Sequence, residues 1–226
     1  MKQYSTTSRT VRLFGHHANK YKRYLYPLLF SVPITVLIGD IIQPFIVSRI
    51  LAIISSGAYD KANLWASFDQ YLIPASILTI AWAVVGWRIN VWLIWNLEIN
   101  VVRDLNRRIF KHLLGMSANF HANRFGGSLV SQTNKLAGAY IRFADATVFN
   151  LLTLVVSVVA AITVLAPRVP MYAGIMLLLS TLFIAGTAYF SKAVRVANSQ
   201  ESAAQTKQTG QLADAITNIM AIKSFA

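Results

Sequence analysis

The sequence predicts an all-α membrane protein with four long transmembrane helices that extend into the cytoplasm and carry short helices there. Three observations predict this fold class. Hydrophobic residues make up 55% of the 226 residues and charged residues only 13%, whereas soluble domains are about 25% charged. Four apolar stretches are each long enough to cross a bilayer, which takes roughly 20 helical residues. The basic residues gather between these stretches rather than within them.

The four predicted spans cover about residues 25–54, 71–96, 146–166 and 169–191. The last two contain no charged residue, because the nearest charges on either side are Asp145, Arg168 and Lys192. Three prolines, at positions 27, 33 and 44, lie in the first span and predict a bent helix there. A membrane helix tolerates such prolines because neighbouring groups can satisfy the freed carbonyls.

The distribution of basic residues predicts the orientation. Seventeen of the 21 Lys and Arg residues lie before the first span, between the second and third, or after the fourth. Only Lys61 and Arg168 lie in the opposite loops. Basic residues near span ends stay on the cytoplasmic side, so we predict a multi-pass protein of the plasma (inner) membrane with both termini in the cytoplasm. The net charge of +13 therefore reports topology, and we expect no nucleic-acid partner.

The helices of the second, third and fourth spans are predicted to continue beyond the membrane, in the cytoplasmic extensions 97–145 and 192–226. After the second span, apolar residues recur every four positions from Leu97 to Leu113, which is helical periodicity. A helix from Tyr71 to Leu114 would be about 66 Å long, twice the hydrocarbon thickness. Its return partner begins near Ser128 and runs into the third span. The short segment SANFHANRFGG connects the two helices.

The extension after the fourth span is rich in Ala and Gln, free of Pro and compatible with continued helix. We expect Gly210 to interrupt it. Beyond that glycine, Leu212, Ile216, Ile219 and Lys223 recur at three- and four-residue spacing. This spacing produces one apolar stripe without a partner in the chain, so we expect a docking element.

Two charges inside the predicted spans are candidates for intramembrane function. Asp40 lies near the middle of the first span and Arg88 beyond the middle of the antiparallel second span. A charge at this depth is costly and usually faces a partner or an aqueous cavity. We expect both side chains to face the bundle interior, where they could pair with each other.

Three stretches resemble the membrane domain of an exporter-type (type IV) ATP-binding cassette (ABC) transporter. The run RRIFKHLLGMSANFHANRFGGSLVSQTNKLAGAYI resembles the passage from the second span over the first coupling helix into the third. LADAITNIMAIKSFA is similar to the second coupling segment, and VRLFGHHANKYKRYLY resembles the amphipathic elbow helix before the first span. Gln132 and Lys135 stand where the family commonly has an Arg and a downstream Asp. The domains implied are an N-terminal segment, 1–24, with the elbow helix, and a partial exporter transmembrane domain, 25–226.

The resemblance implies a role in the translocation path, coupled to ATP hydrolysis by a nucleotide-binding domain. That domain, with its ATP and Mg²⁺, would lie in a missing part of the gene product or on another chain. The partners implied are the lipid bilayer, the nucleotide-binding domain and a second half-transporter. The residues implied in coupling are Asn119, Phe120, His121, Asn123, Arg124, Asp214, Ile216 and Ile219. The alternative is a self-contained four-helix membrane scaffold or partner-binding subunit.

The sequence also lacks the motifs of a catalyst. A phosphate-binding loop needs G-x-x-x-x-G-K-[ST], and no Gly in this chain is followed by Lys. The motif H-E-x-x-H is absent, and the four histidines have no clustered carboxylates. We therefore expect no catalytic residue, no metal site and no bound cofactor in this chain alone, which is then not an enzyme by itself.

Overall fold

The computed structural model describes residues 4–122 and 126–225. These residues are almost entirely helical and contain no strand. Four helices within them are long and apolar enough to cross a membrane, namely Ser8–Ser56, Leu64–Leu114, Leu129–Leu165 and Pro170–Ser191. The all-α membrane fold class is therefore confirmed.

The first long helix changes its winding twice. Its elements in order are α1 (Tyr4–Ala18), the 3₁₀ turn η1 (Asn19–Tyr21), α2 (Lys22–Leu37), the π-helical η2 (Ile38–Ile42) and α3 (Gln43–Ser56). The three prolines do not break it. The π-helical turn η2 lies between Pro33 and Pro44. Each of these prolines lacks a backbone N–H, and its ring displaces the carbonyl group four residues earlier, which favours a change of winding between them.

A tight turn separates the first long helix from the second. Gly57 ends α3 with φ 66°, a left-handed conformation that favours glycine, and its N–H donates to the carbonyl of Ile54. Asn63 then caps the next helix by accepting a hydrogen bond from the N–H of Ala66 at 3.1 Å. The second long helix comprises α4 (Leu64–Ile80), the π-helical η3 (Ala81–Gly86) and α5 (Trp87–Leu114). The predicted continuous helix is confirmed, and it begins at Leu64 rather than Tyr71.

The third long helix follows a short one. The short helix α6 (Ala118–Ala122) lies in the segment that the sequence analysis treats as a connection. The third helix then comprises α7 (Gly126–Asp145), the π-helical η4 (Ala146–Leu152) and α8 (Thr153–Leu165). This is the predicted return helix, which begins close to the expected start at Ser128.

The last long helix, α9 (Pro170–Thr217), corrects one prediction. It runs through Gly210 without interruption and ends only at Thr217, before α10 (Ile219–Phe225). The predicted interruption at Gly210 was wrong, because a single glycine destabilises a helix by only about 1 kcal/mol relative to alanine. The hydrogen bonds of neighbouring turns can offset this loss. The helix beyond the fourth span is thus longer than expected.

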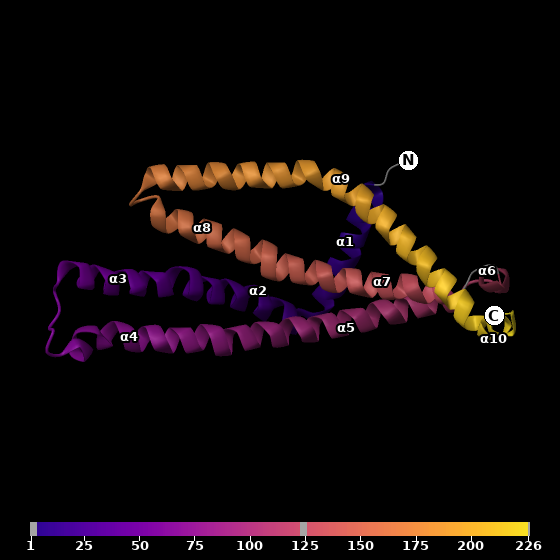
Figure 1. The fold of residues 1–226 in the computed structure, drawn as a ribbon, viewed down its shortest axis with the longest axis horizontal. Coiled ribbons are helices and arrows are strands. Elements are labelled where there is room, and N and C mark those ends of the chain that lie inside the picture. Colours follow the sequence, from indigo (N-terminus) through magenta and orange to yellow (C-terminus); the bar gives the residue numbers. More distant parts are fainter. Residues whose placement is uncertain (1–3, 123–125, 226) are drawn as a thin grey trace. The chain divides into compact units, whose positions relative to one another are not determined.

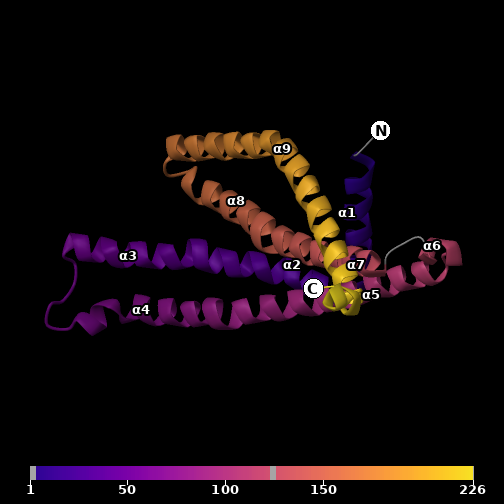
Figure 2. The same ribbon diagram turned by 45° about the vertical axis from the view of Figure 1, so that its right-hand side comes forward.

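The chain divides into two compact units, each described by itself. The first unit comprises Met1–Val101 with Arg142–Gly174, and the second comprises Val102–Ile141 with Ile175–Ala226. In the first unit α3 pairs with α4, and α2 packs against α8 (Figures 1 and 2). Its small core includes Leu28, Ile94 and Leu97, whereas most other large apolar side chains are exposed. An apolar exterior of this kind suits helices that lie in lipid.

Candidate functional site

The short helix α6 is held at the end of α5 by its own capping interactions. Ser117 precedes α6 and accepts two hydrogen bonds from the N–H of Phe120. The carbonyl oxygen of Ser117 accepts at 3.0 Å and its Oγ at 3.3 Å. A serine side chain at this position satisfies a donor that a helix start leaves open. The N–H groups of Gly115 and Met116 donate to the last turn of α5, at His112 and Leu113. The capping therefore sets α6 directly beyond the end of α5.

The sequence-predicted coupling residues of this region lie in or beside α6. Asn119 is exposed and Phe120 is half-buried, and His121 also belongs to the helix. Asn123 and Arg124 lie outside the described residues. Of this first group, Asn119, Phe120 and His121 thus lie on a helix of five residues.

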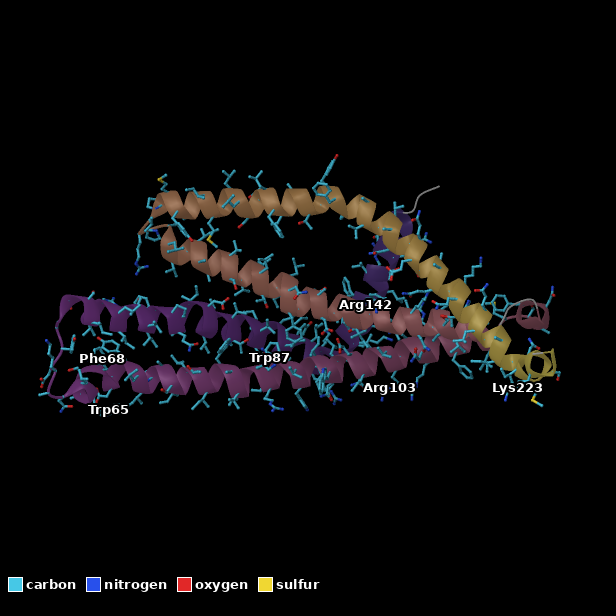
Figure 3. The ribbon with its side chains drawn as sticks, in the orientation of Figure 1. Trp65, Phe68, Trp87, Arg103, Arg142 and Lys223 are labelled. Carbon is cyan, nitrogen blue, oxygen red and sulfur yellow. The ribbon has the colours of Figure 1, made fainter. Side chains whose placement is uncertain are left out.

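The second group of candidate residues spans the end of α9 and the start of α10. Asp214 and Ile216 belong to α9, and Ile219 begins α10. Leu212, Ile216 and Ile219 are 60%, 63% and 44% exposed. Lys223 is exposed on α10 (Figure 3). We call Leu212, Ile216 and Ile219 the C-terminal stripe, which is apolar and accessible as predicted.

The structure does not pair Asp40 with Arg88. Asp40 lies in η2 and accepts a hydrogen bond from Oγ of Ser157 on α8, with 2.6 Å between the oxygens. Arg88 is exposed on α5, and within the described residues no ion pair joins it to Asp40. The expected pair was therefore wrong for this structure, although an interior-facing role for either charge stays a prediction.

The register of the first two spans explains the missing pair. Gln43 Nε2 donates to Thr79 Oγ1 at 2.8 Å, and Ser31 Oγ donates to Asn90 Oδ1 at 2.6 Å. These antiparallel contacts place Asp40 opposite the start of η3 and Arg88 about two turns away, about 10 Å at helical rise. The positions of the two charges along their own spans do not determine this register, which depends on contacts between the helices.

Sequence reasoning missed a polar cluster between α2 and α5. Asn90, only 2% exposed, accepts from Ser31 and donates through Nδ2 to Thr35 Oγ1 at 3.0 Å. The Thr35 hydroxyl in turn donates to the carbonyl of Val32 at 2.8 Å. Ser31 and Thr35 are four residues apart and so share a helix face, which was the available signal. Polar side chains inside a membrane helix pair need such partners.

An apolar cleft lies between the first and third long helices, within the first unit. Its volume is about 440 Å³. It is lined by Leu37, Ile41, Val155, Val156, Val159, Ala160, Thr163 and Val164. Asp40 directly precedes the lining residue Ile41, and Ser157 directly follows the lining residue Val156. The hydrogen bond between Asp40 and Ser157 therefore adjoins an otherwise apolar surface.

Aromatic contacts connect other helices of the first unit. The rings of Trp87 on α5 and Phe149 in η4 have centroids 5.4 Å apart, and Trp87 is also labelled in Figure 3. The rings of Phe14 on α1 and Phe143 on α7 are 5.6 Å apart, with Phe14 only 3% exposed. Helix α1 therefore buries one aromatic side chain, as an amphipathic helix does. The predicted elbow stretch, residues 11–26, is divided among α1, η1 and α2, so an elbow helix stays a prediction.

Comparison with known proteins agrees with this architecture. The family described as ABC transporter transmembrane region matches residues 28–226. No curated protein matches the chain. The family match covers the first membrane-spanning helix from Leu28 onward, the other three membrane-spanning helices, α6 and the C-terminal stripe. The chain therefore belongs to the ABC transporter transmembrane region family.

Proposed function

We propose that this chain forms part of the translocation path of an ABC exporter and transmits movement from a nucleotide-binding domain. Family membership favours this function over a self-contained scaffold. The observation that supports the coupling role is the exposed C-terminal stripe, in which Leu212 and Ile216 at the end of α9 and Ile219 at the start of α10 are accessible. Exposed apolar side chains that cluster in this way mark protein–protein contacts.

The first contact with the nucleotide-binding domain is α6. A helix of five residues has no core of its own, so the half-buried ring of Phe120 is suited to complete its burial in a partner. The other residues proposed for this contact, Asn119, His121, Asn123 and Arg124, are near Phe120 in the sequence. The second contact is the C-terminal stripe with Asp214. ATP and Mg²⁺ act in the nucleotide-binding domain, and a second half-transporter completes the path.

The orientation follows from the basic residues. Both chain ends, α6 and the C-terminal stripe lie in the cytoplasm of a cell whose plasma membrane holds the four spans. Single cysteines test this topology because the chain has none. An impermeant maleimide should label Asp60→Cys in intact cells and Lys111→Cys only after permeabilisation. The reverse labelling pattern would contradict both the orientation and the coupling role.

The coupling role is tested in the complete transporter with spin labels at Asp60 and Arg168, two exposed loop positions of the first unit. Adding ATP should change the distance between these labels. In Phe120→Ala we expect basal ATP hydrolysis to persist and the ATP-dependent distance change to be lost. Phe110→Ala is the matched control, because this ring is also accessible, at 64%, but lies on α5 itself. An unchanged response in Phe120→Ala would show that α6 is an ordinary connection.

A further inference from the structure

Basic residues cluster where the first predicted span begins. Lys20, Lys22 and Arg23 are exposed and directly precede the predicted span at 25–54. We call these three residues the basic cluster. Residues 1–39 contain six Lys and Arg residues and no Asp or Glu. The basic cluster therefore carries positive charge in a part of the chain that has no acidic residue.

The guanidinium group of Arg23 lies against an aromatic ring that connects two helices. Its Cζ is 4.6 Å from the centroid of the Tyr24 ring, a distance typical of a cation–π contact. The Tyr24 ring meets the ring of Trp92 on α5 nearly edge to face, with 5.8 Å between the centroids. Trp92 is 58% exposed and lies near the end of the second predicted span. The cation and both rings are thus together at one end of the first two spans.

Exposed apolar side chains continue this surface along α2. Tyr26 and Phe30 follow Arg23 by three and seven residues, so helical spacing places all three on the same face of the helix. Tyr26 is 47% exposed and Phe30 is 73% exposed. Tyr and Trp side chains are enriched where membrane spans end. This face of α2 therefore has a cation at its membrane boundary and large apolar side chains inside the predicted span.

We propose that the basic cluster binds the phosphate group of an anionic phospholipid whose acyl chains lie along Tyr26 and Phe30. A lipid of this kind matches both parts of the surface. Its phosphate oxygens accept charge-assisted hydrogen bonds from the guanidinium group of Arg23, and its acyl chains cover the exposed rings. An acidic protein segment would match the bases and leave the rings uncovered.

The lipid site is separate from the proposed coupling surface. Arg23, Tyr24 and Trp92 all belong to the first unit, and the site uses neither α6 nor the C-terminal stripe. With the proposed orientation, the lipid belongs to the cytoplasmic leaflet. The site itself does not depend on the coupling role, so failure of one proposal leaves the other standing.

The other end of the first long helix offers a matched control. Arg49 is also exposed, and its Cζ lies 5.1 Å from the centroid of the Phe45 ring. No other Lys or Arg lies between Arg23 and Arg49, or between Arg49 and Lys61. Arg49 therefore makes the same type of aromatic contact without neighbouring bases in the sequence.

The first test is a lipid titration of the full chain in detergent, followed by native mass spectrometry. Short-chain phosphatidylglycerol should bind more tightly than phosphatidylcholine with the same acyl chains. Arg23→Gln should raise the dissociation constant of phosphatidylglycerol about fivefold, the effect of one basic residue near an anionic lipid surface. Arg49→Gln should leave it unchanged. Equal affinities of the wild type for the two lipids, or equal losses in Arg23→Gln and Arg49→Gln, would overturn the proposal.

Further variants keep the proposal testable if Arg23→Gln does not fold. Lys22→Gln leaves the contact between Arg23 and Tyr24 in place and should also weaken phosphatidylglycerol binding. Arg23→Lys keeps the positive charge and should retain most of the affinity. Wild-type affinity in Lys22→Gln would contradict a headgroup site made by the basic cluster.

Soluble competitors distinguish a lipid from other anions. Glycerol phosphate has the anionic group without acyl chains, and a polyglutamate peptide has the charge of an acidic protein segment. Neither should displace phosphatidylglycerol from the wild type at equal concentration. Displacement by glycerol phosphate would show that the surface binds phosphate without selecting a lipid. Displacement by polyglutamate would assign the surface to an acidic protein partner, and either result would overturn the proposal.

Discussion

The contact between α2 and α5 differs from the C-terminal stripe in what it buries. The first buries polar side chains, and the second leaves apolar side chains exposed. Between α2 and α5, the polar side chain of Asn90 is 2% exposed and is satisfied by Ser31 and Thr35. In the C-terminal stripe, apolar side chains such as Ile216, at 63%, are exposed beyond the predicted membrane segments. The polar groups of the first arrangement have their partners within the chain, whereas the apolar side chains of the second are left exposed. The difference separates a helix contact that holds the fold from a surface available for binding.

The largest expected loss of stability is at Gly86, the last residue of η3, which packs against α2. A Cβ on this residue would collide with the Thr35 methyl group, and Thr35 is held by Asn90. Gly86→Ala should therefore lower the free energy of unfolding by about 1–3 kcal/mol, as overpacking does. Gly174→Ala is the control, since nothing lies within 4 Å of a Cβ there. Thermal unfolding in detergent should show a lower melting temperature for Gly86→Ala alone.

The next effect concerns the polar cluster itself. Asn90→Leu removes both hydrogen bonds to α2 and should cost about 1–2 kcal/mol of unfolding free energy. Asn96→Leu is the control, because Asn96 donates at 2.7 Å to the carbonyl of Trp92 in its own helix. Denaturation of both variants in mixed micelles measures the difference. If the two variants are equally stable, the cluster does not hold α2 to α5.

The helices and the contacts between them also differ in how far the sequence predicts them. Apolar length and loop charge predict four helices, and the four-residue periodicity predicts the continuation of α5 to Leu114, because both depend on local pattern. The contact of Asn90 with Ser31 depends instead on the register between two helices, which no local pattern determines. The same limitation produced the wrong pairing of Asp40 with Arg88. The propensity argument at Gly210 failed because helix continuity depends on many turns rather than on one residue.

A smaller loss of stability is expected in the second unit, where neutral oxygen atoms accept hydrogen bonds from the ammonium group of Lys135. Lys135 Nζ on α7 donates to the Ser202 carbonyl at 2.8 Å and to Thr206 Oγ1 at 2.7 Å, both on α9. Because Lys135 is only half-buried, Lys135→Met should cost less than about 1 kcal/mol. Lys207→Met, at an exposed position of α9, should leave stability unchanged. Chemical denaturation of the two variants distinguishes these outcomes.

The smallest effect on stability should come from the C-terminal stripe. Ile216→Ser changes an exposed side chain and should alter the unfolding free energy by less than about 0.5 kcal/mol. In the complete transporter, however, the same variant should weaken ATP-dependent movement in the way that Phe120→Ala does. A large loss of stability in the isolated chain would mean that Ile216 belongs to a core rather than to a binding surface.

The proposed contacts with the nucleotide-binding domain are α6 and the C-terminal stripe. Their most direct test is hydrogen–deuterium exchange, measured on this chain alone and on the complete transporter. Residues 118–122 and 212–223 should exchange more slowly in the complete transporter, because the nucleotide-binding domain covers them. Residues 28–36 of α2, which already contact α5, should exchange at the same rate in both. Equal exchange rates at 118–122 and 212–223 in the two samples would contradict the account.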